Sequence, residues 1–137
     1  MTEWNRMLVS IAIDAAKNCI HVFETEYPGD DRPRKALEAA EKWLAEPTIE
    51  NFRSLEAHEL RVWRSKDWSD RAGSAADACA CAARAARHPM SSAMFAINCE
   101  SFANGLERRD YARKWLWLVL HRHGSDIEKI TQAKRAS

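Results

Sequence analysis

The sequence predicts an all-α fold, a single compact bundle of five to seven helices. Apolar residues recur at three- and four-residue spacing along most of the chain, as they do on one face of a helix. Alternating runs of β-branched residues, which would indicate strands, are absent. All four prolines and three of the four glycines fall between the periodic segments, where such residues interrupt regular structure.

The first two helices are predicted over residues 2–24 and 33–45. One apolar stripe follows the first segment, formed by Trp4, Met7, Leu8, Ile11, Ala15, Cys19 and Val22. Tyr27-Pro28-Gly29 then ends the pattern. Asp31 can cap the free amides at the start of the second helix, and Pro33 suits its first turn because the missing N–H would be unpaired there.

A third helix is predicted over residues 48–65, with Thr48 as its cap after Pro47. The fourth, residues 69–87, is dominated by alanine, which has the highest helix propensity. Because alanine is small, neighbouring helices can approach closely, and we expect this helix to be central.

Proline starts the fifth predicted helix, residues 89–104, and Gly105 stops it. A sixth is expected over residues 107–123, and a short seventh over 126–134. The seventh is supported by Ser125 and Glu128, which have the spacing of a capping box.

Length, charge and composition limit the function. A chain of 137 residues with 46% apolar and 30% charged residues predicts one globular domain, residues 1–137, with a frayed tail over 130–137. A net charge of +1 gives no general attraction to nucleic acid or to an anionic membrane. No run of about 18 apolar residues indicates a membrane span, and no signal peptide is evident. We expect a cytoplasmic protein without strong nucleic-acid binding.

Sequence motifs for catalysis or metal binding are missing. There is no G-x-S-x-G elbow, no glycine-rich phosphate loop and no H-E-x-x-H pair. Cys79 and Cys81 would point about 200° apart on a helix, and with Cys19 and Cys99 they are interpreted as small buried hydrophobes in a reducing compartment. We therefore predict a protein that is not an enzyme, with no metal and no cofactor.

Arg32-Pro33-Arg34 is the sharpest local feature, and two interpretations stay open. Two guanidiniums at a helix start could bind a carboxylate or a phosphate of a partner. Alternatively, Asp30 and Asp31 beside them could form an internal network of ion pairs that fixes the turn.

Six tryptophans are many for this length, and two of them, Trp115 and Trp117, are two positions apart on a predicted helix. Both cannot face the same core, so Trp117 is a candidate for a protein contact, together with the nearby Arg113. Packing within the bundle is the alternative. The basic residues around Arg113 are interleaved with acids, which favours a solvated helix face over nucleic-acid binding.

One stretch carries a family resemblance. It comprises residues 15–24 (AAKNCIHVFE), then Pro28, Asp30, Arg32-Pro33-Arg34, residues 36–39 (ALEA) and Trp43. This stretch resembles the N-terminal signature of the Imm-5-like putative immunity proteins. Ala57-His58 and the alanine-rich helix that follows extend the resemblance to about residues 12–90. Glu56, Glu59 and Arg61 depart from the family pattern around His58, and the C-terminal third does not align.

The resemblance implies an all-α immunity protein of bacterial polymorphic toxin systems, with relatives in phage genomes. Its implied activity is non-catalytic: the protein binds a partner protein and blocks it. The alternatives are a phage or mobile-element protein that neutralises a host defence factor, and a ligand-binding domain or enzyme with an Arg/His pocket that includes His58. The candidate partner-binding residues are Asp30, Arg32, Arg34, Arg113 and Trp117. The oligomeric state stays open.

Overall fold

The computed structural model describes residues 2–65 and 67–105, and this part of the chain is all-α, as predicted. Its helices are α1 (Glu3–Glu26), α2 (Arg32–Ala45), α3 (Ile49–Trp63), α4 (Asp70–Arg84) and α5 (Pro89–Ala103). Each lies within a few residues of the predicted range. The sixth and seventh predicted helices, residues 107–123 and 126–134, lie outside the described residues.

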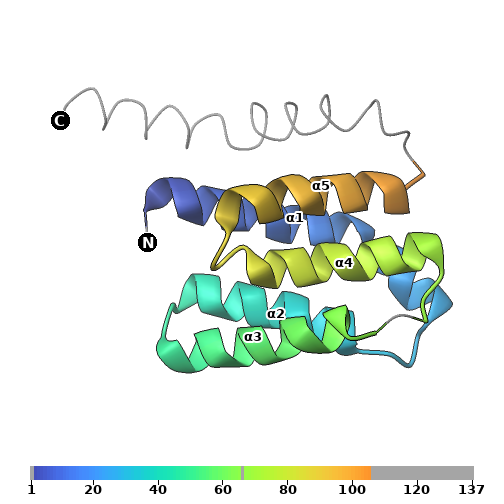
Figure 1. The fold of residues 1–137 in the computed structure, drawn as a ribbon, viewed down its shortest axis with the longest axis horizontal. Coiled ribbons are helices and arrows are strands. Elements are labelled where there is room, and N and C mark those ends of the chain that lie inside the picture. Colours follow the sequence, from blue (N-terminus) through green and yellow to red (C-terminus); the bar gives the residue numbers. More distant parts are fainter. Residues whose placement is uncertain (1, 66, 106–137) are drawn as a thin grey trace.

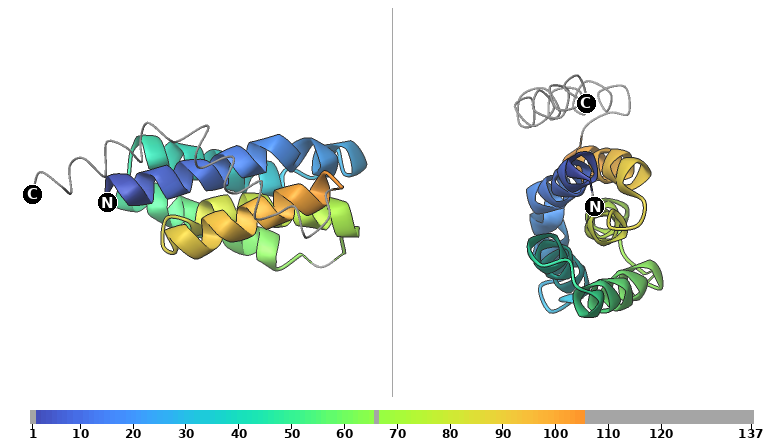
Figure 2. Two further views of the ribbon diagram at one scale, coloured as in Figure 1. Left: turned by 90° about the horizontal axis from the view of Figure 1, so that it is seen from above. Right: turned by 90° about the vertical axis from the view of Figure 1, so that its left-hand side faces the viewer.

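The helices form a curved row with one helix inside it. Neighbouring helices in the row are α5, α1, α2 and α3 in that order, and α4 contacts all four of them. The end-on view in Figure 2 shows α4 enclosed on several sides by this row, while Figure 1 shows the helices running roughly along one common axis. Within the described part of the chain, no helix is long and apolar enough to cross a membrane.

The central position of α4 follows from its alanines, as the sequence predicts. Nine of its residues are buried: Ala72, Ala75, Ala76, Ala78, Cys79, Ala80, Cys81, Ala82 and Ala83. Because these side chains are so small, the helix can contact four neighbours within one core. All four cysteines of the chain are buried and free of disulfides, which agrees with their interpretation as small hydrophobes.

Helix α1 is buried more widely than a single stripe predicts. Val9, Ala12, Ile13 and Ala16 are buried in addition to most of the predicted stripe. The reason is that α1 packs against three helices, α2, α4 and α5, so that more than one of its faces is covered.

The helix ends show which local signals were correct. Thr48 accepts a hydrogen bond from the Asn51 amide over 3.2 Å and caps α3 as predicted. Pro33 and Pro89 lie in the first turns of α2 and α5. Gly105 has φ of +81° just after α5, a conformation that favours glycine at a helix end.

The cap of α2 differs from the prediction. Asp31 occupies the N-cap position, but its side chain makes no capping hydrogen bond. Instead Asp30 accepts from the Arg32 amide over 3.2 Å, while Asp31 pairs with Lys35 one turn along the helix. The neighbouring aspartate therefore satisfies the free amide at this helix start.

Candidate functional site

The turn between α1 and α2 is fixed by an ion pair between Asp30 and Arg32. Arg32 Nε donates to Asp30 Oδ1 over 2.9 Å, and Arg32 Nη2 donates to Asp30 Oδ2 over 2.5 Å. This is the bidentate geometry in which a guanidinium binds a carboxylate most strongly. The pair lies at the start of α2, where the Asp30 carboxylate also accepts the Arg32 amide.

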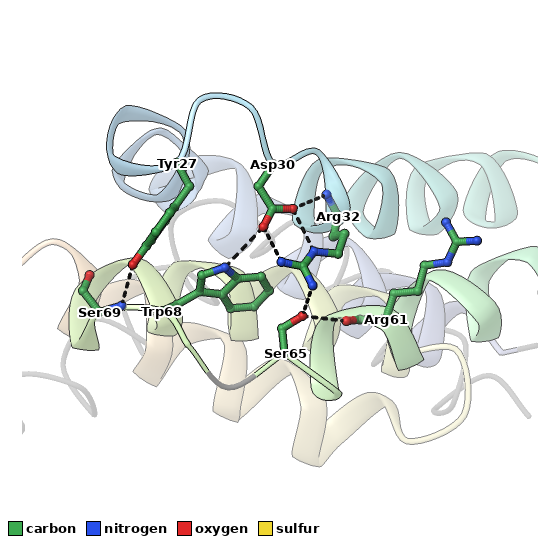
Figure 3. A network of polar contacts seen from close by, with 7 residues as sticks. All are labelled: Tyr27, Asp30, Arg32, Arg61, Ser65, Trp68 and Ser69. Atoms are coloured by element: carbon green, nitrogen blue, oxygen red, sulfur yellow. Dashed lines mark hydrogen bonds and ion pairs between the residues drawn. The ribbon is translucent and has the colours of Figure 1, made fainter.

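The segment that joins α3 to α4 closes over this ion pair. Trp68 Nε1 donates to Asp30 Oδ2 over 3.3 Å, and Arg32 Nη1 donates to the Ser65 hydroxyl. The guanidinium carbon of Arg32 also lies 4.9 Å from the centre of the Trp68 ring, a cation–π contact. Figure 3 shows the Arg32 guanidinium between Asp30 above it and Ser65 below it.

Aromatic contacts hold Trp68 and the start of α4 against the end of α1. The Trp68 ring meets Phe23 edge to face, with centroids 4.9 Å apart and planes at 84°. The Tyr27 hydroxyl accepts a hydrogen bond from the Ser69 amide over 3.0 Å (Figure 3). Because Phe23 is fully buried, these contacts connect the polar cluster to the hydrophobic core.

The electrostatics of the cluster favour its charged form. The hydrogen bonds from the Arg32 guanidinium hold the pKa of Asp30 below its ordinary value, against the opposing effect of burial. In return, the hydrogen bond to Asp30 raises the pKa of Arg32. The pair is therefore charged throughout the physiological pH range.

Arg34 belongs to a different contact. Its Nε donates to Glu24 Oε2 over 3.0 Å, and its Nη2 donates to Glu24 Oε1, so the side chain ties α2 to α1. The hydrogen bond to Glu24 raises the pKa of Arg34. Both arginines of the Arg-Pro-Arg motif are therefore held by carboxylates of the chain itself, and they face separate neighbours.

His58 is the third residue of the predicted Arg/His pocket. It is half-buried on α3, and its pKa is lowered first by burial and then by the charges of Arg61 and Lys35. The cleft beside Arg32 is lined by neither His58 nor Arg34. The cleft beside Arg32 thus does not bring Arg34 and His58 together with Arg32.

That cleft is an open surface depression of about 390 Å³ beside the Asp30–Arg32 pair. Its lining residues, called the arginine cleft below, are Arg32, Arg61, Arg64, Ser65, Asp67 and Trp68. Arg61 and Arg64 were not among the partner-binding residues predicted from the sequence. Their three-residue spacing at the end of the predicted third helix places them near each other, but the cleft also needs Arg32 from α2 and Trp68 from the connection to α4.

A second exposed surface is apolar and lies on α5. Met90, Met94, Phe95 and Phe102 are each between 42% and 49% exposed, whereas the opposite side of the helix packs on α1 and α4. This face was not predicted from the sequence. The two remaining candidates for partner contact, Arg113 and Trp117, lie outside the described residues.

Fold and site together define a small helical domain with a charged and aromatic cleft on its surface. The family comparison is more specific: the model for the Imm-5 like putative immunity protein matches residues 2–122. The chain belongs to this family, as the resemblance over about residues 12–90 predicts. No curated protein matches the chain. No solved structure matches it either.

Proposed function

We propose that this protein is a non-catalytic inhibitor that binds a toxin protein in the cytoplasm and blocks it by direct contact. The observation that carries the proposal is the family match over residues 2–122, which spans nearly the whole chain and describes an immunity protein. The buried, unbridged cysteines suit a reducing compartment.

The arginine cleft is our proposed contact surface for the partner. Arginine and tryptophan dominate the binding energy of protein interfaces, and this cleft combines three arginines with Trp68. The Asp30–Arg32 pair gives the cleft a rigid wall, because the same guanidinium is held by Asp30, Ser65 and the Trp68 ring. A wall that is ordered before binding costs less entropy when the partner docks.

The geometry favours surface binding over a ligand pocket. A pocket for a small ligand would need Arg32, Arg34 and His58 to converge, but Arg34 is paired with Glu24 and the cleft excludes His58. A phage or mobile-element protein that neutralises a host defence factor would use the same kind of binding. Neighbouring genes distinguish the two cases: a toxin gene supports the first, and early phage genes support the second.

The experiment that tests the proposal starts with affinity purification of the tagged chain from its native host. We expect a stoichiometric partner that stays bound at about 0.5 M salt, where screened surface charge contacts alone would weaken. The partner is then produced with and without this chain in a bacterial host. Growth that is arrested by the partner and restored by this chain supports the proposal. A partner whose toxicity is unchanged contradicts it.

Two charge substitutions locate the contact surface in the same growth assay. Arg64→Glu reverses a charge in the arginine cleft, and Phe95→Glu places a charge on the apolar face of α5. We expect Arg64→Glu to weaken rescue and Phe95→Glu to leave it unchanged. The opposite result would move the partner contact to α5.

A further inference from the structure

We infer that the arginine cleft binds paired carboxylates from an acidic segment of the protein partner, with Arg61 and Arg64 as the contacting groups. The inference rests on the proposed function and names the chemistry of the partner. It starts from a difference in ion pairing: other arginines bind carboxylates of the chain, whereas Arg61 and Arg64 do not pair with any described residue.

Three other arginines already hold carboxylates of the chain. Arg32 binds Asp30, Arg34 binds Glu24, and Arg87 binds Glu59. Arg61 and Arg64 are exposed and line the cleft, yet neither forms an ion pair with any of the described residues. Figure 3 shows the Arg61 guanidinium directed away from Asp30 and Ser65. Two guanidiniums beside one cleft are therefore available to a partner.

Carboxylate is the ligand that these guanidiniums fit best. Each guanidinium presents a planar fork of N–H donors that matches the two oxygens of a carboxylate. Arg61 and Arg64 are three residues apart and so are neighbours on the helix surface, with Cβ atoms roughly 5–6 Å apart. That spacing suits two carboxylates carried by nearby residues of one partner segment.

Nucleic acid fits the cleft less well for two reasons. The Trp68 ring is already occupied, because Arg32 covers it, Phe23 packs against it and its indole N–H is bound to Asp30. It is therefore not free to stack on a base, as single-strand binding requires. In addition, the chain carries a net charge of only +1, which gives no general attraction to a long run of phosphates.

The test uses the full chain, labelled with ¹⁵N, and a synthetic peptide with two Glu-Glu pairs separated by glycine, capped at both ends. Binding is followed through the Trp68 indole and arginine side-chain signals at about 20 mM salt, where charge contacts are least screened. We expect these signals to shift in a saturable way. Arg61→Gln with Arg64→Gln should raise the Kd of the peptide about tenfold, since two charged contacts are lost.

Arg53→Gln is the matched control, because Arg53 is an exposed arginine of the same helix that does not line the cleft. We expect it to leave the Kd of the peptide within about twofold. The Arg61 and Arg64 side chains make no hydrogen bond with the described residues, and Arg61 accepts from Ser65 only through its backbone carbonyl. The double variant should therefore fold normally, as judged by unchanged thermal unfolding.

Three results would overturn the inference: no saturable shift with the peptide, equal weakening by Arg53→Gln, or tighter binding of a thymidine oligonucleotide or of pyrophosphate at the same signals. The growth assay separates this failure from failure of the proposed function. If the double variant rescues growth as well as the natural chain does, the carboxylate contact in this cleft is wrong while the inhibitor function stands. If the natural chain itself does not rescue, the proposed function is wrong.

Discussion

Trp68 donates its indole N–H to Asp30 Oδ2 over 3.3 Å, across 38 positions of the sequence. Through this contact the turn after α1 is bound to the segment that leads into α4. The Asp30 carboxylate also accepts hydrogen bonds from the Arg32 guanidinium and from the Arg32 backbone amide. One small side chain therefore caps a helix, neutralises an arginine and joins two connections of the fold.

Asp30→Asn should destabilise the protein by about 1–2 kcal/mol, because it removes the charge that Arg32 and the α2 amide both use. Urea unfolding measures the change in the free energy of unfolding. Asp31→Asn is the matched control, since among the described residues the Asp31 side chain makes only an exposed pair with Lys35, worth about 0.2–0.5 kcal/mol. Equal losses in the two variants would show that the Asp30 network contributes no more than an ordinary surface pair.

The stabilisation by Asp30 should also depend on pH in a defined direction. Its pKa in the folded state is lower than its ordinary value of 3.8, chiefly through Arg32. The unfolded chain therefore binds the proton more readily, and the stabilising contribution is complete above about pH 4 and is lost as the pH falls below it. We expect the difference between the natural chain and Asp30→Asn to be constant from pH 7 to 5 and to shrink towards pH 2. A difference that grows in acid would contradict this assignment.

Local signals in the sequence predicted the helices and the centre of the bundle, but not the network around Asp30. Thr48 and Pro33 act within one helical turn, and the small alanines of α4 allow it to pack inside the bundle. Asp30, not Asp31, accepts the Arg32 amide, and it also accepts the indole N–H of Trp68, which lies far along the sequence. No local rule distinguishes two adjacent aspartates at a helix start.

The candidate site was predicted only in part, because it also depends on contacts between residues far apart in the sequence. The Arg-Pro-Arg motif marked the right turn, and both of its arginines proved to be held by carboxylates of the chain. Arg61 and Arg64 lie beside Arg32 only because the end of α3 packs near the start of α2. Such a meeting depends on how helices pack, which spacing within one helix does not determine.

Close packing around α4 predicts a strong response to added volume. Ala75 is fully buried on this helix, which contacts all four others. Ala75→Leu should lower the free energy of unfolding by about 1–3 kcal/mol, because a larger side chain forces the neighbouring helices apart. Urea unfolding of Ala57→Leu provides the comparison, since Ala57 is exposed on α3. Alanine and leucine both have high helix propensity, so the exposed substitution should change stability little. Similar stabilities for the two variants would mean that the core around α4 is loosely packed.

Asp77 should make the protein more stable in mild acid. Burial raises the pKa of this α4 carboxyl to about 6, from an ordinary value of 3.8. Between these values the folded state binds the proton more readily, so stability falls as the pH rises from about 4 to 6 and stays reduced above it. Asp77→Asn should therefore stabilise the protein at pH 7.5 by about 1–2 kcal/mol, a gain limited by the water that still reaches this partly exposed carboxyl. The substitution should also flatten the pH profile of stability between 4 and 6. Thermal unfolding across this range measures both effects, and an unchanged profile would show that Asp77 titrates normally.

Glu59 and Arg87 should be strongly coupled, because their ion pair joins α3 to the end of α4 with the carboxylate buried. Glu59 is 5% exposed, and it accepts from Arg87 Nη2 over 2.6 Å and from Trp63 Nε1 over 2.8 Å. Arg87→Gln would leave a buried carboxylate without its cation, at a cost of about 2–3 kcal/mol.

Adding Glu59→Gln to that variant should recover part of the loss, since no buried charge would then stay unpaired. Urea unfolding of the natural chain, the two single variants and the double variant gives the coupling free energy between Glu59 and Arg87. Glu56→Gln is the control, because Glu56 reaches Arg87 only at 3.6 Å and its side chain is 42% exposed. Losses that simply add would show that the two side chains stabilise the fold independently, with Glu59 held mainly by Trp63.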